Sequence, residues 1–151
     1  MNPRSLSRRT TALVLAGGVL HAIIALWSSV FVRGGSFSGL FVPETPSGAL
    51  FVSLTVLGLV LLGGIPVLLF YRYKLVAPAV ALVVLFSWAF YSSYRYFEET
   101  RETGATSISL YTDSLFGVLW FVPLALVLLA GAAEYVVRRR FDRFPFGALQ
   151  Q

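Results

Sequence analysis

The chain has 151 residues, of which 57% are hydrophobic and 13% are charged, and its mean hydropathy is +0.78. Because soluble domains carry about 25% charged residues, this composition excludes an ordinary soluble domain and indicates a protein that turns apolar surface toward lipid. The chain has no cysteine and one histidine, His21, which excludes disulfides, thiolate chemistry and any site that needs two imidazoles.

The first predicted element is the apolar segment 11–32, which follows a basic N-terminus. A cleaved signal peptide is the alternative, but its apolar region would be about 7–15 residues long and would end in a small-x-small cleavage site. Segment 11–32 is longer and has no such site, so we interpret it as a retained membrane span. The outer loop that follows, 33–48, is rich in glycine and proline and is not expected to form a continuous helix.

Two uncharged apolar segments, 49–70 and 75–94, are joined by a short basic turn, 71–74. At 1.5 Å per residue, each segment reaches about 30 Å, the thickness of a bilayer's hydrocarbon core. The pattern predicts a membrane-spanning helical hairpin with its turn in the cytoplasm. Within the first arm, Pro66 removes a backbone hydrogen bond and follows a pair of glycines, which predicts a kink near residues 62–66.

Aromatic side chains crowd the end of the third span, as they do at membrane–water interfaces. Arg95 lies four residues before Glu99, a spacing that places both side chains on one face of a helix. The third helix is therefore expected to leave the membrane and to continue to about Glu102, within an outer loop that covers 95–114.

The fourth predicted span is 115–137, with Pro123 near its middle and Glu134 close to its end. A tail, 138–151, follows it. Four spans place both ends of the chain on one side of the membrane. Since Lys and Arg are enriched in cytoplasmic loops, the two ends and the central turn are expected to face the cytoplasm. These segments hold nine of the twelve cations: Arg4, Arg8, Arg9, Arg72, Lys74, Arg138, Arg139, Arg140 and Arg143.

The predicted fold class is thus an all-α integral membrane protein, with one domain over 1–151 and four transmembrane helices in an antiparallel bundle. The predicted location is the cell membrane, with both termini cytoplasmic and the lipid bilayer as a partner. Nucleic acid is not expected as a partner despite the net charge of +5, because the cations flank the spans and membrane orientation accounts for them.

His21 lies at the middle of the first span and is a candidate proton relay or a heme or metal ligand. The structural alternative is a neutral imidazole that donates one hydrogen bond to a neighbouring helix. We favour this alternative, because no ligand partner is visible and His21 lies on a stripe of small residues that permits close helix packing. The other members of the stripe, each four residues apart, are Gly17, Ala25 and Ser29.

Glu134 is the only acid within a predicted span and is a candidate proton or cation site. It lies about one turn from the cytoplasmic end and four residues before Arg138, so an interfacial ion pair is the favoured interpretation. Its depth differs from that of His21 by about 10 Å or more, at 1.5 Å per residue, which disfavours a relay built from the two residues.

Arg138, Arg139 and Arg140 follow the fourth span directly and form a candidate contact for anionic lipid. The simpler interpretation, that they only fix the orientation of the span, is favoured. No pattern of catalytic, phosphate-binding or zinc-binding residues is recognised, no family motif is recognised, and no cofactor or metal is expected.

These observations favour a non-enzymatic structural or accessory subunit of a membrane complex. A protein partner or a second copy of the chain would bind through small-residue helix faces. The alternative hypothesis is a small transporter or channel for protons or ions, in which oligomerisation would supply the pathway. A redox subunit that uses His21 and associates with heme or quinone is the third hypothesis.

Overall fold

The computed structural model describes residues 8–33, 46–103 and 116–141. All the regular structure in these ranges is helical. By length and composition, four helices can each span a membrane, which supports a multi-pass membrane protein. The shortest has 21 residues and is about 32 Å long at 1.5 Å per residue. The four are α1 (Arg8–Arg33), α3 (Pro46–Tyr73), α4 (Ala77–Thr103) and α6 (Phe121–Phe141).

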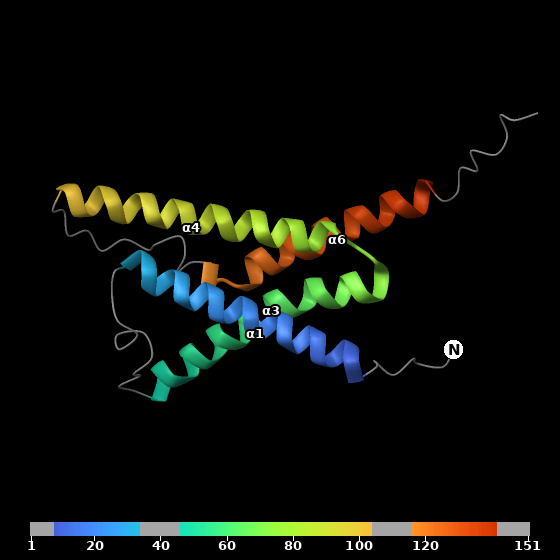
Figure 1. Cartoon of the computed structure of the whole chain (residues 1–151), viewed down its shortest axis with the longest axis horizontal. Helices are drawn as coiled ribbons and strands as arrows, with labels where there is room; N and C mark the ends of the chain where they lie inside the picture. The colour runs from blue at the N-terminus through green and yellow to red at the C-terminus, as the bar shows by residue number, and fades with distance from the viewer. Residues whose placement is uncertain (1–7, 34–45, 104–115, 142–151) are drawn as a thin grey trace, which may run out of the picture.

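The helices form two pairs, since α1 packs most extensively on α3 and α4 packs most extensively on α6 (Figure 1). α3 and α4 follow each other closely in the chain, but they contact each other less than they contact these partners. In Figure 1 the start of α1, the connection between α3 and α4, and the end of α6 all lie toward the right-hand end of the molecule.

The crossing of α1 and α3 is built from two pairs of glycines. Gly17 and Gly18 of α1 face α3, and Gly63 and Gly64 of α3 face α1. Helices in lipid gain little from the hydrophobic effect, so close backbone packing at small residues stabilises their association. The small-residue face of the first span therefore packs closely against another helix, as predicted. That helix is α3 of the same chain.

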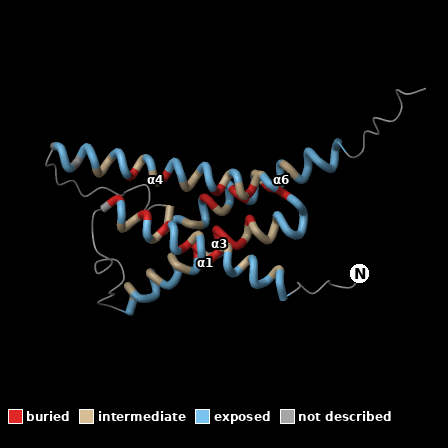
Figure 2. Tube along the Cα trace, viewed as in Figure 1, coloured by how far each residue is buried: buried red, intermediate tan, exposed pale blue. Residues whose placement is uncertain are grey.

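The core lies where the two helix pairs meet, and Figure 2 shows the buried residues (red) gathered there. One cluster joins α1 to α3, and a second joins α3, α4 and α6. Phe116 packs against both clusters and so connects the two pairs. The buried members are Ala22, Ala25 and Leu59 in the first cluster and Leu62, Leu82 and Val127 in the second.

The fourth helix begins later than predicted. Instead of one helix from residue 115, the chain turns at Leu119 and α6 starts at Phe121. Pro123 gives the physical reason, because it has no amide N–H and its ring would clash with the Leu119 carbonyl four residues back. That carbonyl accepts the amide of Val122 instead, at 2.8 Å. Pro123 therefore lies in the first turn of α6, where proline is tolerated.

Other helix ends also differ from the predicted spans. α3 begins at Pro46 and continues to Tyr73, so the connection is 74–76 and not 71–74. α4 continues past the aromatic residues at the end of the third predicted span and reaches Thr103, in agreement with the expected extension to about Glu102. α3 changes direction near its middle, where it passes α1, in agreement with the kink predicted near Pro66 (Figure 1). The remaining parts of the predicted loops and tail, 34–45, 104–115 and 142–151, lie outside the described residues.

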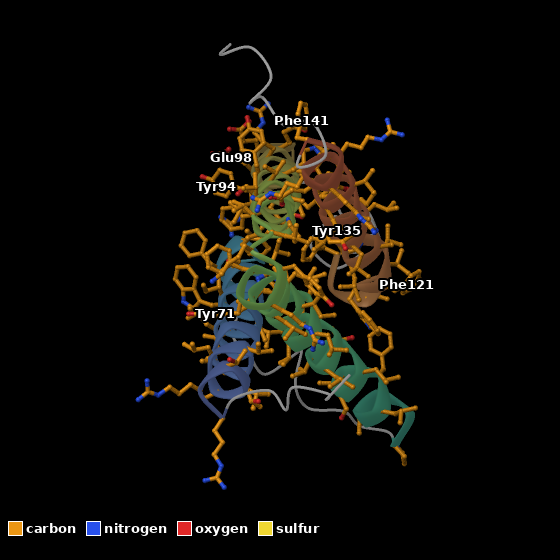
Figure 3. All side chains as sticks on the ribbon, turned by 90° about the vertical axis from the view of Figure 1, so that its right-hand side faces the viewer. Tyr71, Tyr94, Glu98, Phe121, Tyr135 and Phe141 are labelled. Carbon is orange, nitrogen blue, oxygen red and sulfur yellow. The ribbon has the colours of Figure 1, made fainter. Side chains whose placement is uncertain are left out.

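Most of each helix faces away from the rest of the chain. Even in α3, the most enclosed helix, only 33% of the most apolar window is buried. Figure 3 shows side chains pointing outward around every helix, including the aromatic rings of Tyr71, Phe121 and Phe141. Such a surface is stable beside lipid or another apolar partner and not in water.

Candidate functional sites around Glu134 and His21

The first site, around Glu134, lies beside the end of α3 and the start of α4. Lys74, directly after α3, has a φ of 58°, and among the described residues it is the one non-glycine residue in this left-handed conformation. Its amide donates to the carbonyl oxygen of Phe70 at 2.9 Å, which closes the last turn of α3. Its Nζ lies 5.8 Å from the centroid of the Phe70 ring, a cation–π distance. The chain is thereby directed into α4 within three residues.

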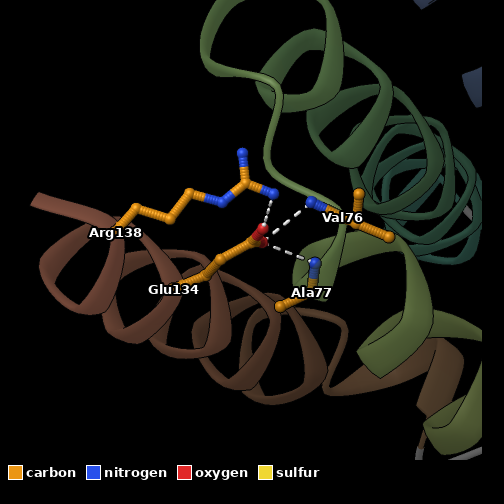
Figure 4. A network of polar contacts seen from close by, with 4 residues as sticks. All are labelled: Val76, Ala77, Glu134 and Arg138. Atoms are coloured by element: carbon orange, nitrogen blue, oxygen red, sulfur yellow. Dashed lines mark hydrogen bonds and ion pairs between the residues drawn. The ribbon is translucent and has the colours of Figure 1, made fainter. Parts of the chain in front are cut away.

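Glu134 of α6 binds the first backbone amides of α4 (Figure 4). Its Oε2 accepts hydrogen bonds from the amides of Val76, at 2.8 Å, and Ala77, at 2.7 Å. Its Oε1 lies 2.6 Å from Nη2 of Arg138. The carboxylate therefore joins the start of α4 to the end of α6 and is only 16% exposed.

The start of α4 lacks a capping side chain of its own. The carbonyl of Val76 accepts the amides of Ala79 and Val80, so Val76 is the N-cap residue, and its side chain has no oxygen. Pro78, in the first turn, has no N–H to satisfy. A carboxylate from α6 thus supplies the missing acceptor and places negative charge at the positive end of the α4 helix dipole.

The ion pair predicted between Glu134 and Arg138 is present in the structure. The capping of α4 was missed by sequence reasoning. The signal that could have found it is the sequence Lys-Leu-Val-Ala before Pro78, which lacks the serine, threonine, aspartate or asparagine that normally begins a helix. An acid at the same depth on another helix is then the natural partner. As a cap, Glu134 performs a structural task.

His21 forms the second site, at the crossing of α1 and α3. A Cβ added at Gly63 would overlap the Cβ of His21, so the histidine backbone lies directly against α3. Its ring lies 5.5 Å from the ring of Phe86 on α4 and 6.4 Å from that of Phe116. Phe86 and Phe116 also contact each other, at 5.8 Å, so the three rings form one aromatic cluster.

The Nε2 atom of His21 is buried and has no hydrogen-bond partner among the described residues. The interhelical hydrogen bond expected from a structural histidine is therefore not made by this nitrogen, because the neighbours in contact with the ring are phenylalanines. A buried polar atom without a partner destabilises the fold by about 1–3 kcal/mol. Such an atom calls for an explanation in packing or in function.

The two candidate residues have separate sets of contacts. The described contacts of His21 are with the α1–α3 crossing and the two phenylalanines, whereas those of Glu134 are with the start of α4 and Arg138. Within the described residues, no three or more side chains of the metal-binding types come together. Comparisons with protein families, with curated proteins and with solved structures found no match to this chain.

Proposed function

We propose that this chain is a protein of the cell membrane that acts as a non-enzymatic structural or accessory subunit of a membrane complex. The observation that supports this function best is the outward apolar surface. The glycines at the α1–α3 crossing are already covered within the chain, whereas apolar side chains cover the outside of every helix. The chain thus offers surface for association and packs its small residues internally.

The proposed arrangement is an antiparallel four-span bundle with both termini in the cytoplasm. The charges of the described helix ends support this orientation. Arg8 and Arg9 begin α1, Arg72 lies in the last turn of α3, and three arginines lie in the last turn of α6. Cations at these ends are typical of the cytoplasmic side.

The best surface for a protein partner is a stripe on α4, named here the α4 stripe. Its members recur at helical spacing and are each more than half exposed, and two of them are large aromatic residues, which are enriched at interfaces. They are Val80, Val84, Trp88 and Tyr91.

Purification of the full chain in mild detergent tests this proposal. The wild-type chain is expected to recover the same partner, or a second copy of itself, in constant proportion. Replacing Trp88 and Tyr91 by alanine should remove that partner. The matched control, Trp27→Ala with Phe31→Ala, changes an equally exposed aromatic pair on α1 and should retain it. Equal recovery of the partner by both variants would rule out the α4 stripe as its binding surface, and a wild-type chain that is always alone would contradict the subunit role.

A second candidate function, a small oligomeric transporter or channel for protons or ions, is favoured by one observation, the buried Nε2 of His21. It predicts flux in liposomes that disappears on His21→Phe, which keeps an aromatic ring in the cluster but removes both nitrogens. The subunit proposal predicts no flux from either chain. A visible absorption band from the purified chain would favour the redox subunit instead.

A further inference from the structure

Cations from two distant parts of the sequence gather at one end of the molecule. Arg72 and Lys74 lie at the end of α3, and Arg138–Arg140 lie at the end of α6. The bonds from Glu134 to the start of α4 hold these two ends together. These five cations therefore lie at the same end of the molecule (Figure 1), which is named here the basic end.

Aromatic rings make a second connection between the same ends. Tyr73 at the end of α3 and Tyr135 of α6 meet edge to face, with ring centroids 6.4 Å apart. The guanidinium of Arg72 lies over the Tyr73 ring, 5.7 Å from its centroid. Both tyrosines are about half exposed, so the basic end also presents aromatic surface of the kind found at membrane interfaces.

Most of this positive charge is not neutralised within the described residues. Glu134 pairs with Arg138 and has its other oxygen on the backbone of α4. Arg72, Lys74 and the last two arginines of α6 are exposed and have no ion-pair partner among the described residues. The other described acids lie near the far end of α4.

We propose that the basic end binds the headgroup of an anionic phospholipid, with Lys74, Arg139 and Arg140 as its main contacts. The phosphate and any further anionic group would lie among these cations. The acyl chains would lie on the exposed apolar surface of α3 and α6. Fixing the orientation requires cations near the span ends, but it does not require two segments to converge. The inference rests on the proposed membrane insertion and not on the subunit role.

Native mass spectrometry of the full chain in detergent tests the site, with phosphatidylglycerol and phosphatidylcholine of the same acyl chains as probes. The wild-type chain is expected to retain phosphatidylglycerol preferentially. Lys74→Gln combined with Arg139→Gln and Arg140→Gln should weaken this binding about 100-fold, since each cation near an anionic surface contributes about five-fold. The double variant Arg139→Lys with Arg140→Lys should retain it, because the charge is kept.

The matched control removes three cations elsewhere: Arg33→Gln, Arg95→Gln and Arg101→Gln should leave phosphatidylglycerol binding unchanged. Equal loss from this control, or equal retention of both lipids by the wild-type chain, would overturn the site. Displacement of the lipid by an equal concentration of inorganic phosphate would also overturn it, by showing a site for free anions. A chain that fails to enter liposomes would instead contradict the membrane proposal itself.

Discussion

Gly18→Ala is expected to destabilise the helix bundle by about 1–3 kcal/mol, the usual cost of overpacking a well-packed core. The added Cβ would overlap the carbonyl oxygen of Val60 and lie 2.9 Å from its Cγ1. A backbone carbonyl within a helix cannot move by itself, so α1 and α3 would have to separate. Thermal unfolding of the purified chain in one detergent measures the loss.

Gly17→Ala is the matched variant, one residue earlier on the same helix. Its Cβ would meet Cγ2 of Val67, at 2.7 Å, whereas the nearest backbone atom of α3, the Gly63 carbonyl oxygen, is 3.8 Å away. Valine is stiff about χ1 in a helix, so this overlap has a cost, but its relief does not require the two backbones to separate. Alanine also favours the helix over glycine by about 0.5–1 kcal/mol, so Gly17→Ala should destabilise the bundle less than Gly18→Ala does. If the two variants are equally stable, the close crossing of α1 and α3 at Gly18 is wrong.

Glu134→Ala is expected to destabilise the fold by about 2 kcal/mol, because it removes charge-assisted hydrogen bonds to two helix-capping amides and the partner of Arg138. The start of α4 should open more often in this variant, while the rest of the bundle stays folded. Hydrogen exchange at the amides of Val76 and Ala77 should accelerate, while exchange in the middle of α1 should not change.

Glu134→Gln tests the hydrogen bonds to the start of α4 separately from the negative charge of residue 134. A glutamine oxygen can still accept the two amides, while the ion pair with the half-exposed Arg138 is lost at a cost of less than about 1 kcal/mol. The expected order of stability is therefore wild type, then Glu134→Gln, then Glu134→Ala. Unchanged exchange at Val76 and Ala77 in the alanine variant would show that α4 does not depend on this carboxylate.

The sequence predicted those features that depend on neighbours along the chain. Long apolar segments predict four spans. The four-residue spacing from Arg95 to Glu99 predicts the extension of α4, and the spacing from Glu134 to Arg138 predicts their ion pair. Each of these is a local rule of helix geometry or length.

The features that were missed depend on which helices meet. Hydropathy does not say that α3 packs mainly on α1 and not on α4, since every span is apolar on most of its surface. Glu134 could not be recognised as a cap until α6 was placed beside the start of α4. The turn before Pro123 follows from a local rule, since proline disrupts the helix four residues before it. It was missed because the residues around Pro123 are apolar and were assigned to one continuous span.

Single cysteines provide the most direct test of the proposed four-span topology, because the chain has no cysteine of its own. Cysteine at Gly34 or Gly104 should react with a membrane-impermeant maleimide in intact cells. Cysteine at Arg72 should react only after permeabilisation. Labelling of Gly34 and Gly104 from opposite sides would contradict four spans, and labelling of both from the cytoplasm would contradict the orientation of the termini.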